Sequence, residues 1–178
     1  MKRIKLAAAA LNQTPIAWDQ NYQNILAAIE QARAQQVDLL CLPELCISGY
    51  GCEDAFLAHG VLETSRDILE SLIPQTQGLA VTLGLPMSVN GRTYNAVAMV
   101  ADGKLLGFAA KQNLAGDGLH YEPRWFCAWP PNQQTMIQVA ENEVPFGDVT
   151  FLIGGVHVGF EICEDAWVQD RPARRFAS

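Results

Sequence analysis

Three residues of this 178-residue chain could do chemistry together, because they supply a carboxylate, an amine and a thiol. Glu44 lies in Leu-Pro-Glu-Leu, Lys111 in Ala-Lys-Gln-Asn-Leu and Cys163 in Glu-Ile-Cys-Glu-Asp. Each follows an apolar run, where a buried strand ends and the next turn releases a side chain into a cleft. Such a set could transfer an acyl group, since the thiol is a nucleophile, the carboxylate moves a proton and the ammonium stabilises an oxyanion.

Each of these residues also fits an ordinary structural role when it is considered alone. Glu44 could cap a helix, Lys111 could be an exposed lysine that ends a hairpin, and a cysteine with apolar neighbours usually packs as a small hydrophobic residue. Cys163 differs from the other four cysteines because three acids lie within two residues of it. These acids would raise the pKa of the thiol, so we expect a cation such as Lys111 beside it.

A histidine is the rival partner for the thiol. His157 lies six residues before Cys163 on the same apolar run. A fully extended chain would separate the two residues by about 2 nm, which disfavours a Cys/His dyad unless the turn at Gly159 folds the segment back.

The elements that must position these side chains alternate between α and β. Residues 3–11 are expected to form a strand, and Asp19–Gln36 an amphipathic helix whose apolar side chains recur at helical spacing. Asp38–Pro43 contains the uninterrupted apolar run Leu-Leu-Cys-Leu (39–42), which predicts a short strand covered on both faces. Residues 61–73 show a second helical pattern that Pro74 ends.

The middle of the chain changes to the period of strands. Three strands are predicted at 79–85, 93–100 and 104–110, with breaks at Pro86, Asn90-Gly91 and Asp102-Gly103. The last two breaks suit type I′ hairpins. Residues 112–131 are rich in glycine, proline and aromatic residues and read as a long functional loop, and Phe151–Val158 as a strand pair around Gly154-Gly155.

Composition favours one globular domain, 1–178, because 49% of the residues are hydrophobic and no linker or repeat interrupts the pattern. The net charge of −7 and the absence of a basic stripe argue against a nucleic-acid partner. No stretch has the roughly 18–20 apolar residues that a bilayer crossing needs, and Lys5 interrupts what would otherwise resemble a secretory signal. We therefore expect no membrane partner and a soluble, cytoplasmic protein.

The five cysteines are odd in number and include no Cys-x-x-Cys pair. A structural zinc site is therefore not expected. We expect the protein to reside in a reducing compartment, where the cysteines stay unpaired.

Three segments together resemble the signature blocks of the nitrilase, or carbon-nitrogen hydrolase, superfamily. They are Leu-Pro-Glu-Leu-Cys-Ile-Ser-Gly-Tyr (42–50), Lys-Gln-Asn-Leu (111–114) with Tyr-Glu-Pro-Arg-Trp-Phe (121–126), and Gly-Phe-Glu-Ile-Cys-Glu-Asp-Ala-Trp (159–167). Within the superfamily the chain is most similar to the N-terminal glutaminase domain of glutamine-dependent NAD synthetases, through the loop 120–126 and the Cys-Glu-Asp-x-Trp block.

The resemblance implies an α/β fold, the αββα sandwich of the nitrilase type. It implies Glu44 as general base and acid, Lys111 as oxyanion stabiliser and Cys163 as nucleophile. Further residues are carried over by position. The resemblance implies that Glu122 orients the lysine. It also implies four residues of the substrate pocket: Tyr50, Glu122, Glu164 and Trp167. Asp117 replaces the aromatic residue of some relatives, and Arg124 is a candidate partner for Glu122 or a substrate carboxylate.

The activity that the resemblance implies is hydrolysis of the glutamine side-chain amide through a Cys163 thioester, without a metal or an organic cofactor. The ammonia would serve an NAD synthetase domain that this chain lacks, and ATP and Mg are expected only there. Two alternatives stay open: a stand-alone amidase, carbamoylase or nitrilase acting on another small C–N substrate, and a non-catalytic module.

We also expect the domain to be truncated at its C-terminus, since the superfamily fold continues beyond the nucleophile. An incomplete sheet would expose apolar edges and favour pairing with a partner, and a homo-oligomer is expected. Whether the 178-residue chain is active by itself is left open.

Overall fold

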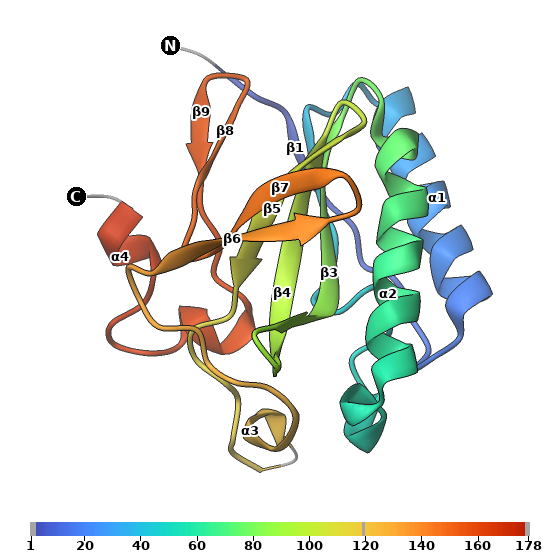
Figure 1. Ribbon diagram of the computed structural model, residues 1–178. Coiled ribbons are helices and arrows are strands. Elements are labelled where there is room, and N and C mark those ends of the chain that lie inside the picture. The colour runs from blue at the N-terminus through green and yellow to red at the C-terminus, as the bar shows by residue number, and fades with distance from the viewer. Residues whose placement is uncertain (1–2, 119, 177–178) are drawn as a thin grey trace.

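The computed structural model describes residues 3–118 and 120–176 (Figure 1). Residues 1–2, 119 and 177–178, which the predicted domain 1–178 includes, lie outside the described part. A seven-stranded sheet forms the centre, in the order β1-β2-β3-β4-β5-β7-β6. Its strands are β1 (Leu6–Ala8), β2 (Leu39–Cys41), β3 (Ala80–Val89), β4 (Arg92–Ala101), β5 (Lys104–Ala110), β6 (Gln134–Val139) and β7 (Asn142–Gly147). A separate hairpin pairs β8 (Phe151–Ile153) with β9 (Val156–Val158).

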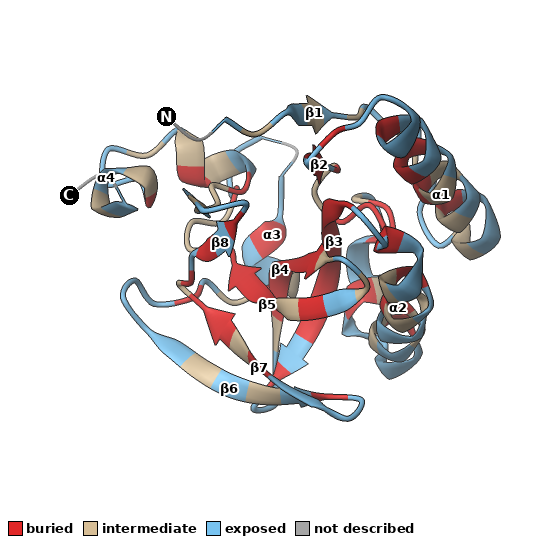
Figure 2. Ribbon diagram, turned by 90° about the horizontal axis from the view of Figure 1, so that it is seen from above, coloured by how far each residue is buried: buried red, intermediate tan, exposed pale blue. Residues whose placement is uncertain are grey.

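Two long helices, α1 (Trp18–Ala34) and α2 (His59–Leu72), cover one face of the sheet (Figures 1 and 2). The apolar side chains of α1 that share helical spacing are buried, as predicted: Ile25, Ala28, Ile29 and Ala32. The remaining helices are single turns: α3 (Glu122–Trp125), α4 (Ala173–Phe176) and the 3₁₀ helices Glu53–Leu57, Ile73–Thr76 and Cys163–Ala166. Among the described residues, no helix combines the length and the apolar character that a bilayer crossing requires.

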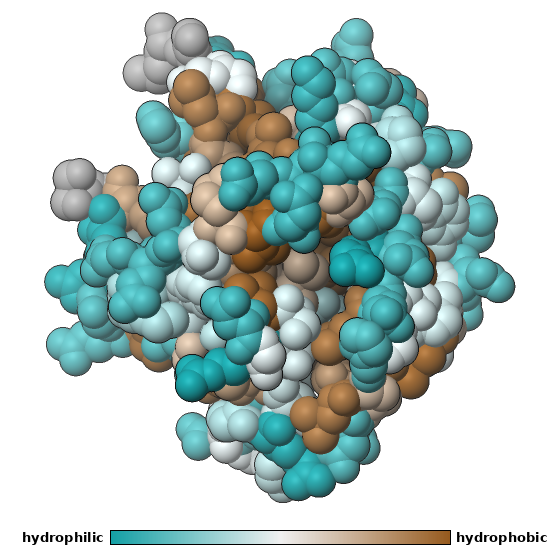
Figure 3. All heavy atoms as spheres, in the orientation of Figure 1, coloured by the Kyte–Doolittle hydropathy of each residue, from teal (hydrophilic) through white to brown (hydrophobic). Residues whose placement is uncertain are grey.

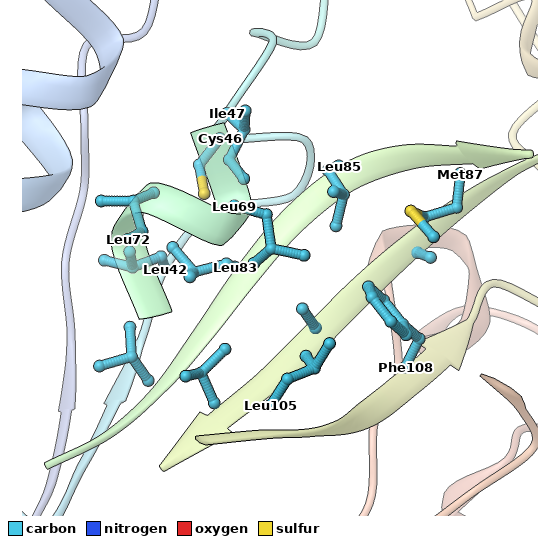
Figure 4. Close-up of a cluster of buried hydrophobic side chains, with 14 of the residues drawn as sticks. Leu42, Cys46, Ile47, Leu69, Leu72, Leu83, Leu85, Met87, Leu105 and Phe108 are labelled. Atoms are coloured by element: carbon cyan, nitrogen blue, oxygen red, sulfur yellow. The ribbon is translucent and has the colours of Figure 1, made fainter. Parts of the chain in front are cut away.

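The main core lies between the sheet and these two helices. Leu42, Leu69, Leu72, Leu83 and Phe108 meet there (Figure 4). The opposite face of the sheet carries a smaller cluster that includes residues of the β8–β9 hairpin. β2 is covered on both faces at Leu39, which packs in the smaller cluster, and at Leu40, which packs in the main one, but its last residue, Cys41, is exposed, so the expected cover is incomplete. Full burial of each leucine or phenylalanine contributes about 1.5–3 kcal/mol to folding.

The strand directions bring the functional segments to one edge of the sheet. β1, β2 and β3 are parallel, β4 is antiparallel to β3, and β5 is antiparallel to β4. The C-terminal ends of β2 and β5 therefore lie at the same edge as the N-terminal end of β4. Segments far apart in the sequence can converge there.

The two predicted type I′ hairpins are confirmed. Asn90 and Gly91 have φ of 50° and 74°, and Asp102 and Gly103 have φ of 51° and 72°. Positive φ at both central residues is what this turn type requires, and Asn, Asp and Gly tolerate it best. These turns fix the β3–β4–β5 meander and, with it, the position of Lys111.

Three details of the strands differ from what the sequence predicted. Pro86 does not separate elements, because it lies within β3 and is paired with Asn95 of β4. The β6–β7 hairpin was not predicted, since its turn at Ala140 and Glu141 has no glycine and β7 contains Pro145, a residue that usually argues against a strand. Ala140 nevertheless adopts a φ of 49°. The first strand is also shorter than expected.

Apolar side chains are exposed on β1 and on the β8–β9 hairpin. Leu6 of β1 is 64% exposed and Leu152 of β8 is 61% exposed. Figure 3 shows hydrophobic surface around the β8–β9 hairpin, between more polar regions.

Candidate active site

Lys111 follows β5 directly, and its side chain has no exposed surface. Its Nζ donates to Glu44 Oε1 at 2.6 Å and to Glu122 Oε1 at 2.8 Å. A buried ammonium needs such partners, because an unpaired charge in the interior is costly. The alternative of an exposed lysine at a hairpin end is therefore wrong.

Glu44 lies in the turn after β2, and close packing against β3 fixes that turn. A Cβ on Gly84 would lie 2.4 Å from the Leu45 nitrogen and 2.9 Å from the Pro43 oxygen, so only glycine allows the approach. Leu45 has a φ of 51°, a conformation that non-glycine residues rarely adopt. Residues 44–48 form turns, not a helix, so Glu44 is not a helix cap.

Asn95 was missed by the sequence analysis. This β4 residue is 1% exposed, and its Nδ2 donates to Glu44 Oε1 at 2.7 Å. Lys111 and Asn95 thus both contact Oε1, and among the described residues no donor contacts Oε2. The signal was an asparagine directly before the apolar run 96–101 of the same strand, since a buried amide needs a polar partner.

Glu122, at the start of α3, is fully buried and joins the ion pair to the loop. Its Oε1 also accepts the Tyr50 hydroxyl at 3.1 Å, and its Oε2 accepts the backbone N–H of Ala115 at 2.7 Å. Burial and the nearby Glu122 raise the pKa of Tyr50, so the phenol keeps the proton that it donates. The contact between Glu122 and Lys111 suits the predicted orienting role.

Cys163 begins the 3₁₀ helix Cys163–Ala166 with a φ of 48°. The residue is exposed, and it lines a cavity of about 120 Å³ together with Glu44 and Asn95. Val97 of β4 and, from the segment before Cys163, Phe160 and Ile162 add apolar lining. Glu161 of the same segment lines the cavity too. The structure therefore brings Cys163 and Glu44 to one cavity, with Lys111 bonded to Glu44.

The charges of the cluster oppose one another. Burial raises the pKa of Glu44 although Lys111 lowers it, and burial would lower the pKa of Lys111 but the two glutamates raise it overall. Burial, Glu44 and Glu122 raise the pKa of Cys163, against Lys111 and a backbone hydrogen bond from Glu164. The resting sulfur is therefore a thiol, and a base must take its proton during attack.

The three acids next to Cys163 in sequence are not the main source of this shift. Glu161 forms an ion pair with Arg171, and Asp165 is 2% exposed among hydrogen-bond donors. The carboxylates that raise the thiol pKa come from Glu44 and Glu122, which are remote in sequence. The expected cation is present, but its effect is outweighed.

The predicted pocket residues divide into two groups. Tyr50 and Glu122 belong to the hydrogen-bond network of Lys111. Glu164 and Trp167 instead belong to the turn that begins at Cys163, where Trp167 is 81% exposed. None of the four lines the small cavity.

Of two other candidates, Arg124 has a different partner from those expected, and His157 lies apart from the cavity. Arg124 donates to Asp54 at 2.6 Å and 2.8 Å, so it is not the partner of Glu122. His157 lies in β9 and is not among the residues that line the cavity with Cys163.

In residues 3–118 and 120–176, no group of three or more His, Cys, Asp or Glu side chains is arranged to hold a metal ion. A groove of about 440 Å³ runs between β1 and α1, is lined largely by alanines, and contains none of the candidate catalytic residues.

Comparison with known proteins places this geometry in context. The carbon-nitrogen hydrolase family matches residues 5–173. The glutamine-dependent NAD(+) synthetases of rat and human are each 32% identical to the chain over 182 aligned residues, which cover 96% of the chain. The chain spans about a quarter of the length of these relatives, 25% and 26%.

Solved structures give the same picture. A glutamine-dependent NAD(+) synthetase from Cytophaga hutchinsonii is 50% identical with a TM-score of 0.89, covering 90% of this chain and 28% of its own. The corresponding enzyme from Acinetobacter baumannii is 26% identical with a TM-score of 0.80, covering 99% and 30%. An amidase from Nesterenkonia is 18% identical with a TM-score of 0.69, covering 91% and 56%, and confirms the predicted nitrilase-type fold.

Proposed function

Because the chain belongs to the carbon-nitrogen hydrolase family, we propose that it hydrolyses the side-chain amide of glutamine to glutamate and ammonia. The pairing of buried Lys111 with Glu44, and the shared cavity of Glu44 and Cys163, carry this proposal. Glutamine is favoured as the substrate because the relatives similar to this chain are named as glutamine-dependent enzymes.

Glu44 is the proposed base, and Oε2 is the proposed reacting oxygen because Oε1 already accepts two hydrogen bonds. Glu44 takes the thiol proton while the sulfur of Cys163 bonds to the amide carbon, and the carbonyl electron pair moves to the oxygen. When the C–N bond breaks, Glu44 returns the proton to nitrogen and ammonia leaves. Glu44 then takes a proton from a water that attacks the thioester carbon. The C–S bond breaks, glutamate leaves, and Glu44 returns the proton to the sulfur.

Lys111 is the proposed electrostatic stabiliser of the oxyanion. Glu44 and Glu122 keep its ammonium protonated and fixed in place. A donor that is held before the reaction needs no reorganisation when charge develops on the carbonyl oxygen. The backbone N–H of Glu164, which contacts the resting sulfur, is the proposed second donor.

The remaining elements of the proposal concern substrate and partners. Glu164 and Trp167 would contact the glutamine, whereas Tyr50 and Glu122 would act on it through Lys111. The amidase step would need no metal and no organic cofactor. The ammonia would pass to a synthetase domain, which would use ATP and Mg. A homo-oligomer in the cytoplasm is part of the same proposal.

Ammonia release from glutamine tests the proposal. The protein should release ammonia from glutamine, and Cys163→Ala should abolish the release while the melting temperature stays unchanged. Cys127→Ala, at another cysteine outside the cavity, is the matched control and should keep full activity. Preferential turnover of other small amides would instead favour a stand-alone amidase, and ammonia release that survives Cys163→Ala would contradict the mechanism.

A further inference from the structure

Asp165 has a buried carboxylate that joins two segments of the site. Its Oδ1 accepts the backbone N–H of Asn113 at 2.7 Å, the Nδ2–H of Asn113 at 2.9 Å and the backbone N–H of Gln112 at 3.2 Å. Its Oδ2 accepts the backbone N–H of Ile162 at 3.1 Å. One oxygen therefore holds the two residues after Lys111, and the other holds the residue before Cys163.

The turn Cys163–Ala166, here called the nucleophile turn, needs such a restraint. Cys163 has a left-handed backbone with a φ of 48°, and it begins a 3₁₀ turn of only four residues. A non-glycine residue keeps this conformation only where its surroundings determine it, because the conformation costs free energy. Cys163 as a residue is exposed, so side-chain packing around it supplies little of this restraint.

We propose that Asp165 is a positioning residue, which holds the Cys163 thiol in place relative to Glu44 and Lys111 by tying the nucleophile turn to the segment after β5. The inference deepens the proposed function, because it concerns the same nucleophile. It does not depend on glutamine being the substrate.

The carboxylate cannot be replaced by its amide without loss. Each oxygen of Asp165 faces N–H donors, three on one side and one on the other. An asparagine has one acceptor oxygen and one NH₂ group, so in either orientation its NH₂ would face a donor. Asp165→Asn therefore breaks one side of the connection while it keeps the shape and volume of the side chain.

The test is the pH dependence of Cys163 alkylation by iodoacetamide, followed on the peptide that contains Cys163. The charged groups that act on the thiol are Glu44, Lys111 and Glu122, and together with burial they raise its pKa. In folded Asp165→Asn we expect the turn to carry the thiol away from these charged groups. The apparent pKa of Cys163 should then fall toward about 8.5, the value of an unperturbed cysteine. Asn113→Ala, which removes only one donor, should shift the profile the same way by less.

Asp102→Asn is the matched control. Asp102 also accepts a backbone N–H, that of Gly78 at 2.9 Å, but it lies in the turn after β4. Seven residues separate it from Asn95, which is roughly 23 Å along a strand. This variant should leave the alkylation profile unchanged.

The outcomes separate this inference from the proposed function. If glutamine is hydrolysed, Asp165→Asn should lower kcat by about 100-fold with little change in KM, as a misplaced group does. A shifted alkylation profile without any glutaminase activity in the wild type would support the positioning role and contradict the proposed function. Wild-type profiles in both Asp165→Asn and Asn113→Ala would overturn the inference, and if Asp165→Asn does not fold, Asn113→Ala decides alone.

Discussion

Phe108 and Lys111 lie three residues apart at the end of the same strand, and neither has exposed surface. Phe108 packs in the main core, with its ring centroid 5.9 Å from that of Phe146. Lys111 instead bonds to Glu44 and Glu122. Equal burial therefore has two meanings here, because the aromatic side chain is held by many weak contacts and the ammonium by two specific partners.

This difference predicts how each region responds to substitution. The apolar layer loses stability in proportion to the volume removed, and its neighbours keep their chemistry. The polar cluster loses the balance of charges, because each removed partner leaves another buried charge unpaired. Substitutions in the two regions should therefore separate stability from activity.

Lys111→Met should have the largest effect, because it should lower both stability and activity. Loss of the ammonium leaves Glu44 and Glu122 buried without a counter-charge, which should destabilise the fold by about 3–5 kcal/mol. It should also lower amide hydrolysis by about 10²–10³-fold, the loss expected for an oxyanion donor. Chemical denaturation and ammonia release measure the two effects.

A double variant sharpens the interpretation of Lys111→Met. Adding Glu122→Gln removes one of the two unpaired carboxylates, so part of the lost stability should return while activity stays low. If the double variant is less stable than Lys111→Met, the charge balance is not what holds this cluster together.

Phe108→Ala tests the apolar region and should change stability alone. Truncation of a fully buried phenylalanine leaves a cavity and should cost about 3–5 kcal/mol. At a temperature where the variant is still folded, its kcat should remain within a few-fold of the wild type. A loss of activity as large as that of Lys111→Met would remove the distinction between the two regions.

Tyr50→Phe should have a smaller effect within the polar cluster. The change removes the hydroxyl that donates to Glu122 Oε1, while Lys111 still occupies the same oxygen. One such hydrogen bond to a charged group contributes about 1.5–3 kcal/mol at most. Thermal unfolding should show a modest decrease, and an unchanged melting temperature would mean that the hydroxyl is not coupled to the cluster.

Glu44→Gln should change the reactivity of the Cys163 thiol by only a few-fold, although it should abolish hydrolysis. The negative charge of Glu44 raises the pKa of Cys163. A neutral amide should therefore lower that pKa, so alkylation of Cys163 at neutral pH should rise by a few-fold. An alkylation profile shifted to higher pH would have the wrong sign and would contradict the charge assignment.

Much of the fold was predictable from local patterns. The helical spacing of α1, the Asn-Gly and Asp-Gly turns and the apolar run of β2 each specify local structure by themselves. The β6–β7 hairpin was not predictable in this way, because its turn has no glycine and its strands show no clear apolar run. Its pairing with β5 is a tertiary effect.

The site shows the same division. Glu44, Lys111 and Cys163 were found because each follows an apolar run, and the structure joins them at one edge of the sheet. The contributions of Asn95 and Asp165 were not foreseen, because a contact across β4 or between two loops leaves no spacing in the sequence. The exposure of Trp167 and the pairing of Arg124 with Asp54 were likewise hidden.

The most direct test of the account is the mass of the peptide that contains Cys163 after reaction with glutamine and a rapid acid quench. The proposed mechanism predicts a glutamyl adduct on Cys163 that forms with the wild-type protein, disappears as glutamate is released, and is absent from Cys163→Ala. Ammonia release with no adduct on Cys163 at any time, or with the adduct on another residue, would contradict the assignment of the nucleophile.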